Sequence, residues 1–468
     1  MSKTANLENP GETGDLHIPE AYRVTSIVLE NHRGQIYDLS SLQTDFSITE
    51  SIYHAGLILS INIKDSINFF EIGQLTGQET ITVNLTQGSG PDKAIPKTIS
   101  RMFFVTEYPL YGKMENRIQV YTIKGVSRHI YLSKLKRISK AFSGKMADFI
   151  KDTLINDLGV NKLNIVQSKQ SSPPVSFIVP NLNPIDAILW ILRRCYDSHG
   201  SPWYCYETLD GKIHIESHMD INAKAKESNI NEYSDGQFFQ NRVGTIEDFK
   251  QRSRRILNLA SNVGISKYLS GINGAYASKS VYVNISSKKI ETVDLNYAAK
   301  FPYMAKIGAN SPLSSAFFPE TREAINAATL TQSSDVNATA LTLSRFNDSN
   351  INYIPLNGKS QGNNNNYHST TKNGAINIAN SVNENMQFIS HDFTITGDLN
   401  FHSGSIVNLL LRSSFKPQKV LNAQSKADEQ KMFSGYYLIT SVVHKFEKQY
   451  YCDVRANTDA YSANVLTA

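Results

Sequence analysis

Alternating apolar and polar positions predict strands in the first third of the chain. The clearest alternation has apolar side chains at every second position, at Ala55, Leu57, Leu59, Ile61 and Ile63. A period of two places those side chains on one face of a strand. Further strands are predicted at 22–30, 81–85, 99–107 and 116–126. Residues 20–131 therefore predict one antiparallel sheet or barrel.

Helical periodicity follows these strands. Ser143 is predicted to cap one helix, and Asn183 is predicted to cap a second helix that has Pro184 in its first turn. A hairpin is predicted over 202–217, because the two strands meet at an Asp-Gly turn. Residues 132–220 therefore predict a small α+β domain.

The second half of the chain predicts another sheet, split in sequence. A helix is expected at 246–260, followed by a strand in which Val281, Val283 and Ile285 alternate. Its partner strands are expected much later, at 392–401, 405–412, 435–447 and 450–456. Residues 300–385 between them are rich in Asn, Ser, Thr and Ala and contain a run of four Asn. We expect a loop-rich insertion there, because few large apolar residues are available for a core.

These patterns define the expected fold class and domains. The class is α+β and β-rich, with two tube-like antiparallel β-barrel domains, a small α+β domain and the insertion. Residues 1–19 are polar and contain two Gly and two Pro, which predicts a flexible arm. The expected domains are 20–131 for the first barrel, 132–220 for the α+β domain, 221–299 with 386–468 for the split second barrel, and 300–385 for the insertion.

Composition and charge narrow the function classes. Hydrophobic residues make up 40% of the 468 residues and charged residues 19%, and the formal net charge of +5 is small for this length. This balance does not indicate nucleic-acid binding. The densest basic stretch lacks the aromatic interleaving of a phosphate-tracking patch, so we interpret it as solvated or subunit-facing surface. Its members are Arg128, Lys134, Lys136, Arg137 and Lys140.

Cysteine usage and hydropathy add two exclusions. The three cysteines, Cys195, Cys205 and Cys452, form no CxxC pair and indicate synthesis in a reducing compartment. No run of about 18 apolar residues predicts a membrane span, and the N-terminus lacks the apolar core of a signal peptide. We therefore expect no stable membrane association.

Motifs of phosphate and metal sites are incomplete. Gly358-Lys359-Ser360 resembles the end of a phosphate loop, but Tyr353 stands where the motif needs Gly. His214 and His218 have the spacing of helical metal ligands, yet they lie in an alternating segment. Strand geometry would separate them by roughly 13 Å, too far for one ion. We expect no catalytic, cofactor-binding or metal-binding residues, and no cofactor.

Carboxylates and aromatic residues leave two alternatives open. Glu207, Asp210 and Glu216 lie on or near one hairpin, and a glycosidase needs two carboxylates across a cleft. We interpret them as exposed hairpin charges, and a cell-wall hydrolase as an alternative. Tyr-rich strands suit a carbohydrate-binding tail or adhesion module, although Trp190 and Trp203 are expected in the core.

Several segments, in order, resemble the baseplate hub proteins of contractile-tailed phages, which are related to the hub half of type VI secretion spike proteins. The segments are IVPNLNPIDAILWI at 178–191, WYCYE at 203–207, GKIHI at 211–215, GAYAS at 274–278, GDL at 397–399, GSIV at 404–407, and GYYLI at 435–439 with His444 and Phe446. Together they cover about half the chain. Ser405 stands where the family often has Asp, and the 300–385 tract has no counterpart.

The resemblance implies a structural, non-enzymatic hub subunit in the tail baseplate of a virion, assembled in the host cytoplasm. Three chains with two barrels each would form a pseudo-sixfold ring. Such a ring would join a hexameric tail tube, or its initiator protein, to a trimeric spike among other baseplate proteins, and DNA would pass through it only as cargo. About a dozen residues follow the last predicted strand, so we expect the spike on another chain. A phage tail and a phage-derived injection particle both remain open, as do the interface residues.

Overall fold

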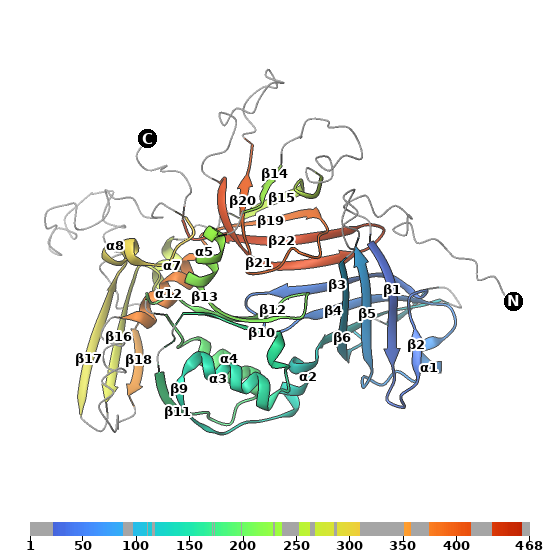
Figure 1. The fold of residues 1–468 in the computed structure, drawn as a ribbon, viewed down its shortest axis with the longest axis horizontal. Helices are drawn as coiled ribbons and strands as arrows, with labels where there is room; N and C mark the ends of the chain where they lie inside the picture. Colours follow the sequence, from blue (N-terminus) through green and yellow to red (C-terminus); the bar gives the residue numbers. More distant parts are fainter. Residues whose placement is uncertain are drawn as a thin grey trace, which may run out of the picture.

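The structure is a computed structural model. It describes residues 22–87, 97–109, 111–114, 118–170, 172, 174–197, 199–227, 230–235, 252–262, 267–284, 288–308, 351–356, 374–412 and 433–460. The predicted 1–19 arm, the Gly358-Lys359-Ser360 tripeptide and the run of four Asn lie outside these residues. Long strands dominate the molecule and helices pack beside them (Figure 1), which confirms the β-rich α+β class.

The N-terminal sheet region consists of eight strands. They are β1 (Tyr22–Glu30), β2 (Ile36–Asp38), β3 (Gln43–Ser51), β4 (Ile58–Asp65), β5 (Thr80–Gln87), β6 (Lys97–Glu107), β7 (Tyr111–Met114) and β8 (Ile118–Ser127). Helix α1 (Phe69–Ile72) lies between β4 and β5 in sequence. The predicted alternation is confirmed in β4, where Leu59, Ile61 and Ile63 are fully buried.

The C-terminal sheet region comes from two separated parts of the chain. Its strands are β14 (Glu232–Ser234), β15 (Ile256–Asn262), β19 (Ile389–Thr396), β20 (Ile406–Leu410), β21 (Gly435–Phe446) and β22 (Tyr450–Thr458). The strands predicted from 392 onward are confirmed with shifted ends. Within the helix predicted at 246–260, Arg252 and Ser253 are helical, but the prediction is wrong from Ile256 onward, because β15 pairs with β19 there. Backbone pairing overrides the helical preference of Leu and Ala in this segment.

The two regions form one 14-stranded sheet. Its main path runs β15-β19-β22-β21-β3-β4-β8-β6-β5-β1-β2, while β7 pairs with β8, and β20 pairs with both β14 and β21. A single bridge between Ser234 and Arg255 also connects β14 to the start of β15. One hydrophobic core contains side chains from both regions.

A smaller layer packs beside the sheet. Its elements are α2 (Arg128–Leu135), β9 (Ala141–Lys145), α3 (Met146–Asp152), a π-helical turn (Thr153–Asp157), β10 (Ile165–Gln167), β11 (Pro174–Ile178), α4 (Pro184–Leu192), β12 (Trp203–Glu207), β13 (Ile213–Ser217) and α5 (His218–Glu227). Asn183 precedes α4 and Pro184 begins it, as predicted. The cap at Ser143 is wrong, because Ser143 lies in β9 and pairs with Ser176 of β11.

A separate three-stranded sheet lies at the left of Figure 1. It contains β16 (Ala277–Asn284), β17 (Lys289–Asn296) and β18 (Ile351–Leu356), near α7 (Lys267–Ile272), α8 (Tyr297–Lys300) and α12 (Ala375–Asn385). The expected partners of the 281–285 strand are therefore wrong, because β16 pairs with β17 and β18. Both β18 and α12 fall within 300–385. Among the described helices, none is long and apolar enough to cross a membrane.

Candidate functional site, the junction of the two sheet regions

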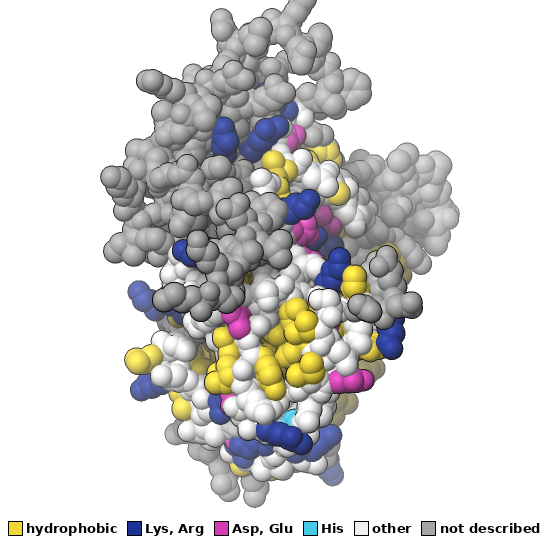
Figure 2. Space-filling model, turned by 90° about the vertical axis from the view of Figure 1, so that its right-hand side faces the viewer, with side chains coloured by type: hydrophobic (Ala, Val, Ile, Leu, Met, Phe, Trp, Pro, Cys, Tyr) yellow, Lys and Arg dark blue, Asp and Glu magenta, His cyan; other side chains and the backbone are white. Residues whose placement is uncertain are grey.

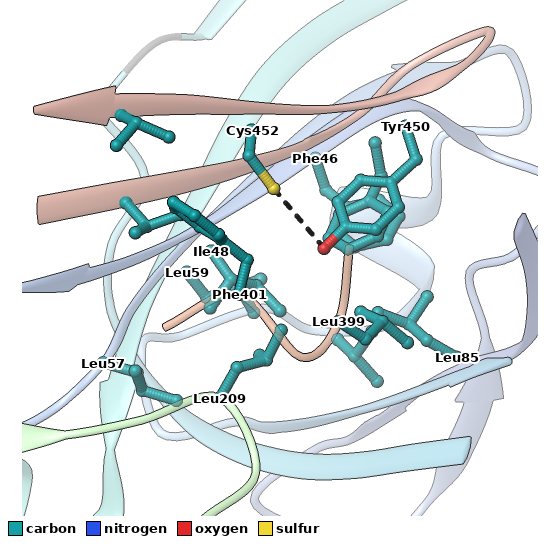
Figure 3. Packing of buried hydrophobic residues seen from close by; sticks show 14 of the residues in the cluster. Phe46, Ile48, Leu57, Leu59, Leu85, Leu209, Leu399, Phe401, Tyr450 and Cys452 are labelled. Carbon is teal, nitrogen blue, oxygen red and sulfur yellow. Dashed lines mark hydrogen bonds between the residues drawn. The ribbon is translucent and has the colours of Figure 1, made fainter. Parts of the chain in front are cut away.

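The two sheet regions meet edge to edge at β3 and β21. These strands pair antiparallel from Phe46 opposite Phe446 to Ser51 opposite Ser441, although about 390 residues separate them in sequence. Phe46 and Phe446 stack with ring centroids 4.6 Å apart. Figure 3 shows side chains of β3, β4, β5, β22 and the segment after β19 packed into one core. The chain therefore joins two sheets with no break in backbone pairing.

Glu50 is a buried carboxylate at this junction. It lies on β3, and its side chain is fully buried. The Oε1 atom lies 3.0 Å from Nε2 of His444 on β21 and accepts the Ser403 N–H at 3.3 Å. The Oε2 atom accepts the Leu209 N–H at 3.1 Å, from the turn between β12 and β13. One side chain thus connects the N-terminal sheet region, the C-terminal sheet region and the β12–β13 hairpin.

Glu50 and His444 form a buried ion pair. Burial raises the pKa of Glu50, but hydrogen bonds from His402 and His444 outweigh burial and hold that pKa below its usual value. Burial lowers the pKa of His444, but Cys452 and Glu50 outweigh it and raise that pKa to about 10. Both groups are therefore charged at neutral pH.

Cys452 extends the pair into a Cys-His-Glu series. Its Sγ lies 3.4 Å from His444 Nδ1, and the Tyr450 hydroxyl lies 2.8 Å from the same nitrogen. Figure 3 shows the contact between Cys452 and Tyr450 inside the core. These residue types suit nucleophilic catalysis. However, all four side chains are fully buried, so no substrate reaches the sulfur in this structure. The buried Cys-His-Glu series connects side chains of β3, β21 and β22.

The segment between β19 and β20 forms hydrogen bonds with side chains of β5 and β6. Gln87, at the end of β5, donates from Nε2 to the Gly397 carbonyl at 2.7 Å and accepts the Leu399 N–H at 2.8 Å. Lys97 donates from Nζ to Asn400 Oδ1 at 2.8 Å. The N-terminal sheet region therefore bonds directly to residues 397–400 of the C-terminal region.

Two glycines of the resemblance motifs have a steric role in this segment. A Cβ on Gly397 would lie 2.1 Å from Cγ of Tyr450. A Cβ on Gly404 would lie 2.0 Å from the Tyr206 hydroxyl oxygen, and Gly404 also has a φ of +81°. Larger residues at either position would force the packed rings apart.

The prediction of exposed hairpin carboxylates is wrong for Glu207 and Glu216. Both are buried, with 4% and 2% of their surface exposed. Glu207 pairs with Arg101, accepts a hydrogen bond from Ser127, and accepts the Leu57 N–H at 3.2 Å. It therefore connects the hairpin to the N-terminal sheet region. A hairpin covered on both faces buries charges that its sequence would place in solvent.

Glu207 and Glu216 do not flank one cleft. The register of the hairpin pairs Glu207 with Ile213 and Glu216 with Tyr204, which places the two carboxylates on opposite faces. Glu216 is paired with Lys224, and its Oε1 lies 2.9 Å from His214 Nδ1. Each carboxylate is thus engaged in its own contact. Asp210 lies in the turn, where its carboxylate accepts a hydrogen bond from Thr208 at 2.5 Å.

The two histidines of the predicted metal spacing have different surroundings. His214 lies on β13 and stacks on Tyr206, whereas His218 begins α5 and contacts the edge of Tyr204. Burial lowers the pKa of His218 to about 4, so it is neutral at pH 7. No group of three or more His, Cys, Asp or Glu side chains in the described part of the chain is placed to hold a metal ion.

Lysines of the basic stretch form ion pairs, and the tryptophans and cysteines pack in or against the hydrophobic interior. In the basic stretch, Lys134 pairs with Asp186, and Lys136 and Lys140 both pair with Asp157. This agrees with the interpretation of an ordinary surface. Trp203 is buried in the core of the smaller layer, and half-buried Trp190 packs against the same cluster. All three cysteines are free and buried.

Sequence reasoning missed Glu50 as a site residue, although a signal was present. The alternation of β3 puts Phe46, Ile48 and Glu50 on one face, and that face is buried. The same holds in β21 for Val442, His444 and Phe446. A titratable residue in the apolar series of a strand predicts a buried charge that needs a partner.

A four-strand run occurs twice in the sheet. The N-terminal run is β3-β4-β8-β7, the C-terminal run is β15-β19-β22-β21, and every neighbouring pair is antiparallel. The first strand of each run shifts register at the same place, at Gln43/Asp45 and at Ile256/Asn258. The rows that follow the shift are Asp45-Asn62-Thr122 and Asn258-Thr394-Asp453.

Side-chain bonds support this correspondence. Asn62 donates from Nδ2 to Asp45 Oδ2 at 2.8 Å, and Thr122 donates from its hydroxyl to Asn62 Oδ1 at 2.8 Å. In the second run, Thr394 donates to Asp453 at 2.7 Å. Each run thus has a polar row with side-chain hydrogen bonds at the same level, so the chain contains two strand runs of the same order and register.

Comparisons with solved structures return phage tail and secretion proteins. The tail protein of Neisseria meningitidis MC58 aligns at 8% identity and a TM-score of 0.48, over 94% of this chain and 97% of that one. The 43 kDa tail protein of prophage MuSo2 from Shewanella oneidensis aligns at 9% identity and a TM-score of 0.46, over 93% and 98%. The E. coli c3393 protein, a component of the type VI secretion system, aligns at 8% identity and a TM-score of 0.40, over 96% and 80%.

No family model matches the sequence, and no curated protein matches it. The solved structures above have TM-scores below 0.5. The function proposed below therefore rests on the contacts of this chain and on the resemblance of its sequence motifs.

Proposed function

We propose that this chain is a structural baseplate hub subunit of a contractile injection machine. Three copies form a ring of six sheet units, which joins a hexameric tail tube to a trimeric spike and leaves a channel for DNA or other cargo. The observation that carries the proposal is the duplicated strand run, joined edge to edge inside one chain at β3 and β21.

Ring symmetry supports this function. Two similar units per chain allow a threefold object to present six equivalent positions, so that unlike symmetries meet end to end. The buried Glu50–His444 pair and the Gln87 contacts favour a fixed angle between the two units, which a ring requires. The bridge from Ser234 to Arg255 supports tube-like closure of the C-terminal unit.

The role is proposed to be structural, with no catalytic or cofactor-binding residues. A cell-wall hydrolase is disfavoured, because Glu207 and Glu216 lie on opposite faces of the hairpin. Against a carbohydrate-binding module, strand tyrosines including Tyr204, Tyr206, Tyr437 and Tyr450 are buried, whereas Tyr111, Tyr353 and Tyr436 are exposed on three different strands.

The assembly is tested on the purified full-length chain. We expect light scattering to give three times the mass of one chain, alone or with the trimeric spike, and electron micrographs to show rings with threefold symmetry. A mass of one chain at high protein concentration, with no larger species when the spike is present, contradicts the proposal.

A further inference from the structure

The duplicated run predicts which strands of neighbouring copies pair. Inside the chain, β3 of the first run pairs with β21 of the second. By the same correspondence, β15 takes the place of β3, and β7 takes the place of β21. We propose that β15 of one copy pairs antiparallel with β7 of a second copy. This inference rests on the proposed function, because it names the contact that closes the ring.

Both strands have an edge available in the described structure. Among the described residues, β7 pairs only with β8, and β15 pairs only with β19 apart from the bridge beside it at Arg255. The sequence of β15, ILNLASN, contains neither charge nor proline. Proteins usually protect a free strand edge with charges, prolines or very short strands. An unprotected strand of seven residues is therefore suited to pairing with another chain.

The register of the contact follows from the duplication. Within the chain, Ser47 lies opposite Lys445, and Ile48 lies opposite His444. The position of Ser47 corresponds to Ala260, and that of Ile48 to Ser261, when the two register shifts are aligned.

On the other edge, that of β7, Lys445 corresponds to Gly112, because Lys445 faces Tyr451 of β22 and Gly112 faces Val120 of β8. In the same way His444 corresponds to Tyr111, because His444 faces Cys452 and Tyr111 faces Tyr121. The contact between copies therefore places Ala260 opposite Gly112 and Ser261 opposite Tyr111.

Repeating this strand contact from unit to unit gives a closed ring. Each unit offers a β3-type edge to the β21-type edge of the next unit, alternately within a chain and between chains. A head-to-tail contact of this kind forms a closed ring when the rotation per unit allows it. Three chains supply six units and three contacts of the proposed kind.

Apolar side chains next to both edges agree with a protein partner. Tyr111 on β7 is 50% exposed, and Leu257 on β15 is 48% exposed. The Tyr111 ring lies 5.4 Å from that of Phe70 on α1, which connects β7 to the end of the molecule that carries α1 and β2. Figure 2 shows hydrophobic side chains gathered on the face seen from that end. Contact with a second copy would remove such side chains from water.

Cysteine pairs test the register directly. The double variant Gly112→Cys/Ala260→Cys is suitable because a Cβ on Gly112 meets no atom within 4 Å, Ala260 is exposed, and the native cysteines are buried. With a short thiol-to-thiol crosslinker, we expect covalent dimers and closed trimers on a denaturing gel. A mixture of the two single variants should give covalent dimers only, because each chain then carries one reactive edge.

The control shifts the register by one residue. Gly112→Cys/Ser261→Cys points the second thiol to the opposite face of β15, so crosslinking should fall by about tenfold. Equal crosslinking in both pairs, or none in a chain that light scattering shows to be trimeric, overturns the inference and leaves the proposed function standing. A chain that never forms a trimer contradicts the proposed function itself.

Hydrogen exchange on the unmodified chain gives a second measurement. We expect the amides of β7 and β15 to exchange at least about tenfold more slowly in the trimer than in the diluted monomer. Unchanged exchange at both strands in a confirmed trimer also overturns the inference, and this readout does not depend on whether the cysteine variants fold.

Discussion

The strands β3 and β15 hold the same place in the two strand runs, yet one is buried and the other is exposed. Phe46 and Ile48 of β3 have 2% and 0% of their surface exposed. At the corresponding positions of β15, Leu259 is half-buried and Ser261 is exposed. The difference follows from the neighbour, because β3 is covered by β21 of the same chain.

The same strand order suits two kinds of contact, one within the chain at β3 and one proposed between chains at β15. The covered edge has large apolar residues and the buried Glu50–His444 pair, and it forms as the chain folds. The open edge mixes uncharged polar residues with smaller apolar ones, and Leu257 on it is 48% exposed. Because β15 carries no charge and no proline, its edge remains able to pair. Substitutions at matched positions test this difference.

The largest expected effect is at the matched pair Phe46 and Leu259. Phe46→Ala removes a buried ring that stacks on Phe446, so we expect the free energy of unfolding to fall by about 3–5 kcal/mol. Leu259→Ala removes a half-buried side chain and should cost about 1 kcal/mol. Urea unfolding of the monomer measures both. Equal losses would show that the two edges are covered to the same degree.

Glu50→Gln tests the ion pair that only the covered edge has. The amide keeps the shape of the carboxylate but leaves the His444 imidazolium buried without its counter-charge. We expect a loss of about 3 kcal/mol in the free energy of unfolding. The control is Asn262→Ala on the exposed end of β15, which should stay within about 0.5 kcal/mol of the parent chain. A loss below about 1 kcal/mol for Glu50→Gln would contradict a charged pair.

Gly397→Ala tests the close approach between the 397–400 segment and Tyr450. The added methyl group would overlap the ring, so we expect a loss of about 1–3 kcal/mol from overpacking. Gly112→Ala, at the open edge of β7, adds the same group where no atom lies within 4 Å and should be nearly neutral. Thermal melting of both variants under one condition provides the measurement. A neutral Gly397→Ala would mean that Tyr450 moves aside freely.

Much of the fold was predictable because it depends on local alternation. Strand β1 has the predicted bounds of 22–30, and β21 and β22 fall close to their predicted ranges. The partners of β16 were not predictable, because alternation identifies a strand without identifying its neighbour. The nearby β17 and the later β18 both satisfy the same pattern.

The site was less predictable, for a related reason. Whether Glu207 is exposed depends on Arg101 and Ser127, which other parts of the chain bring to the hairpin. Glu50 was detectable in principle, as a charged residue in the apolar series of β3. Its partner His444 lies 394 residues later, and no local pattern connects the two. The duplicated run likewise appears in the registers and not in residue identity.

The pH dependence of stability gives the smallest expected effect and isolates His444. The folded-state pKa of His444 is raised to about 10 from an ordinary 6.5, so its charge favours the folded state fully below pH 6.5. That contribution is lost as pH rises through about 10. The lowered pKa of Glu50 acts in the opposite direction, with a contribution present above pH 4.5 and lost as pH falls through the lowered value. Against His444→Gln, which keeps a donor but does not titrate, the advantage of the parent chain should shrink by about 1.5 kcal/mol between pH 6.5 and 8. Urea unfolding of both chains across that range measures the difference. A constant difference would show that His444 is neutral in the folded protein, and that the covered edge is held by a neutral hydrogen bond.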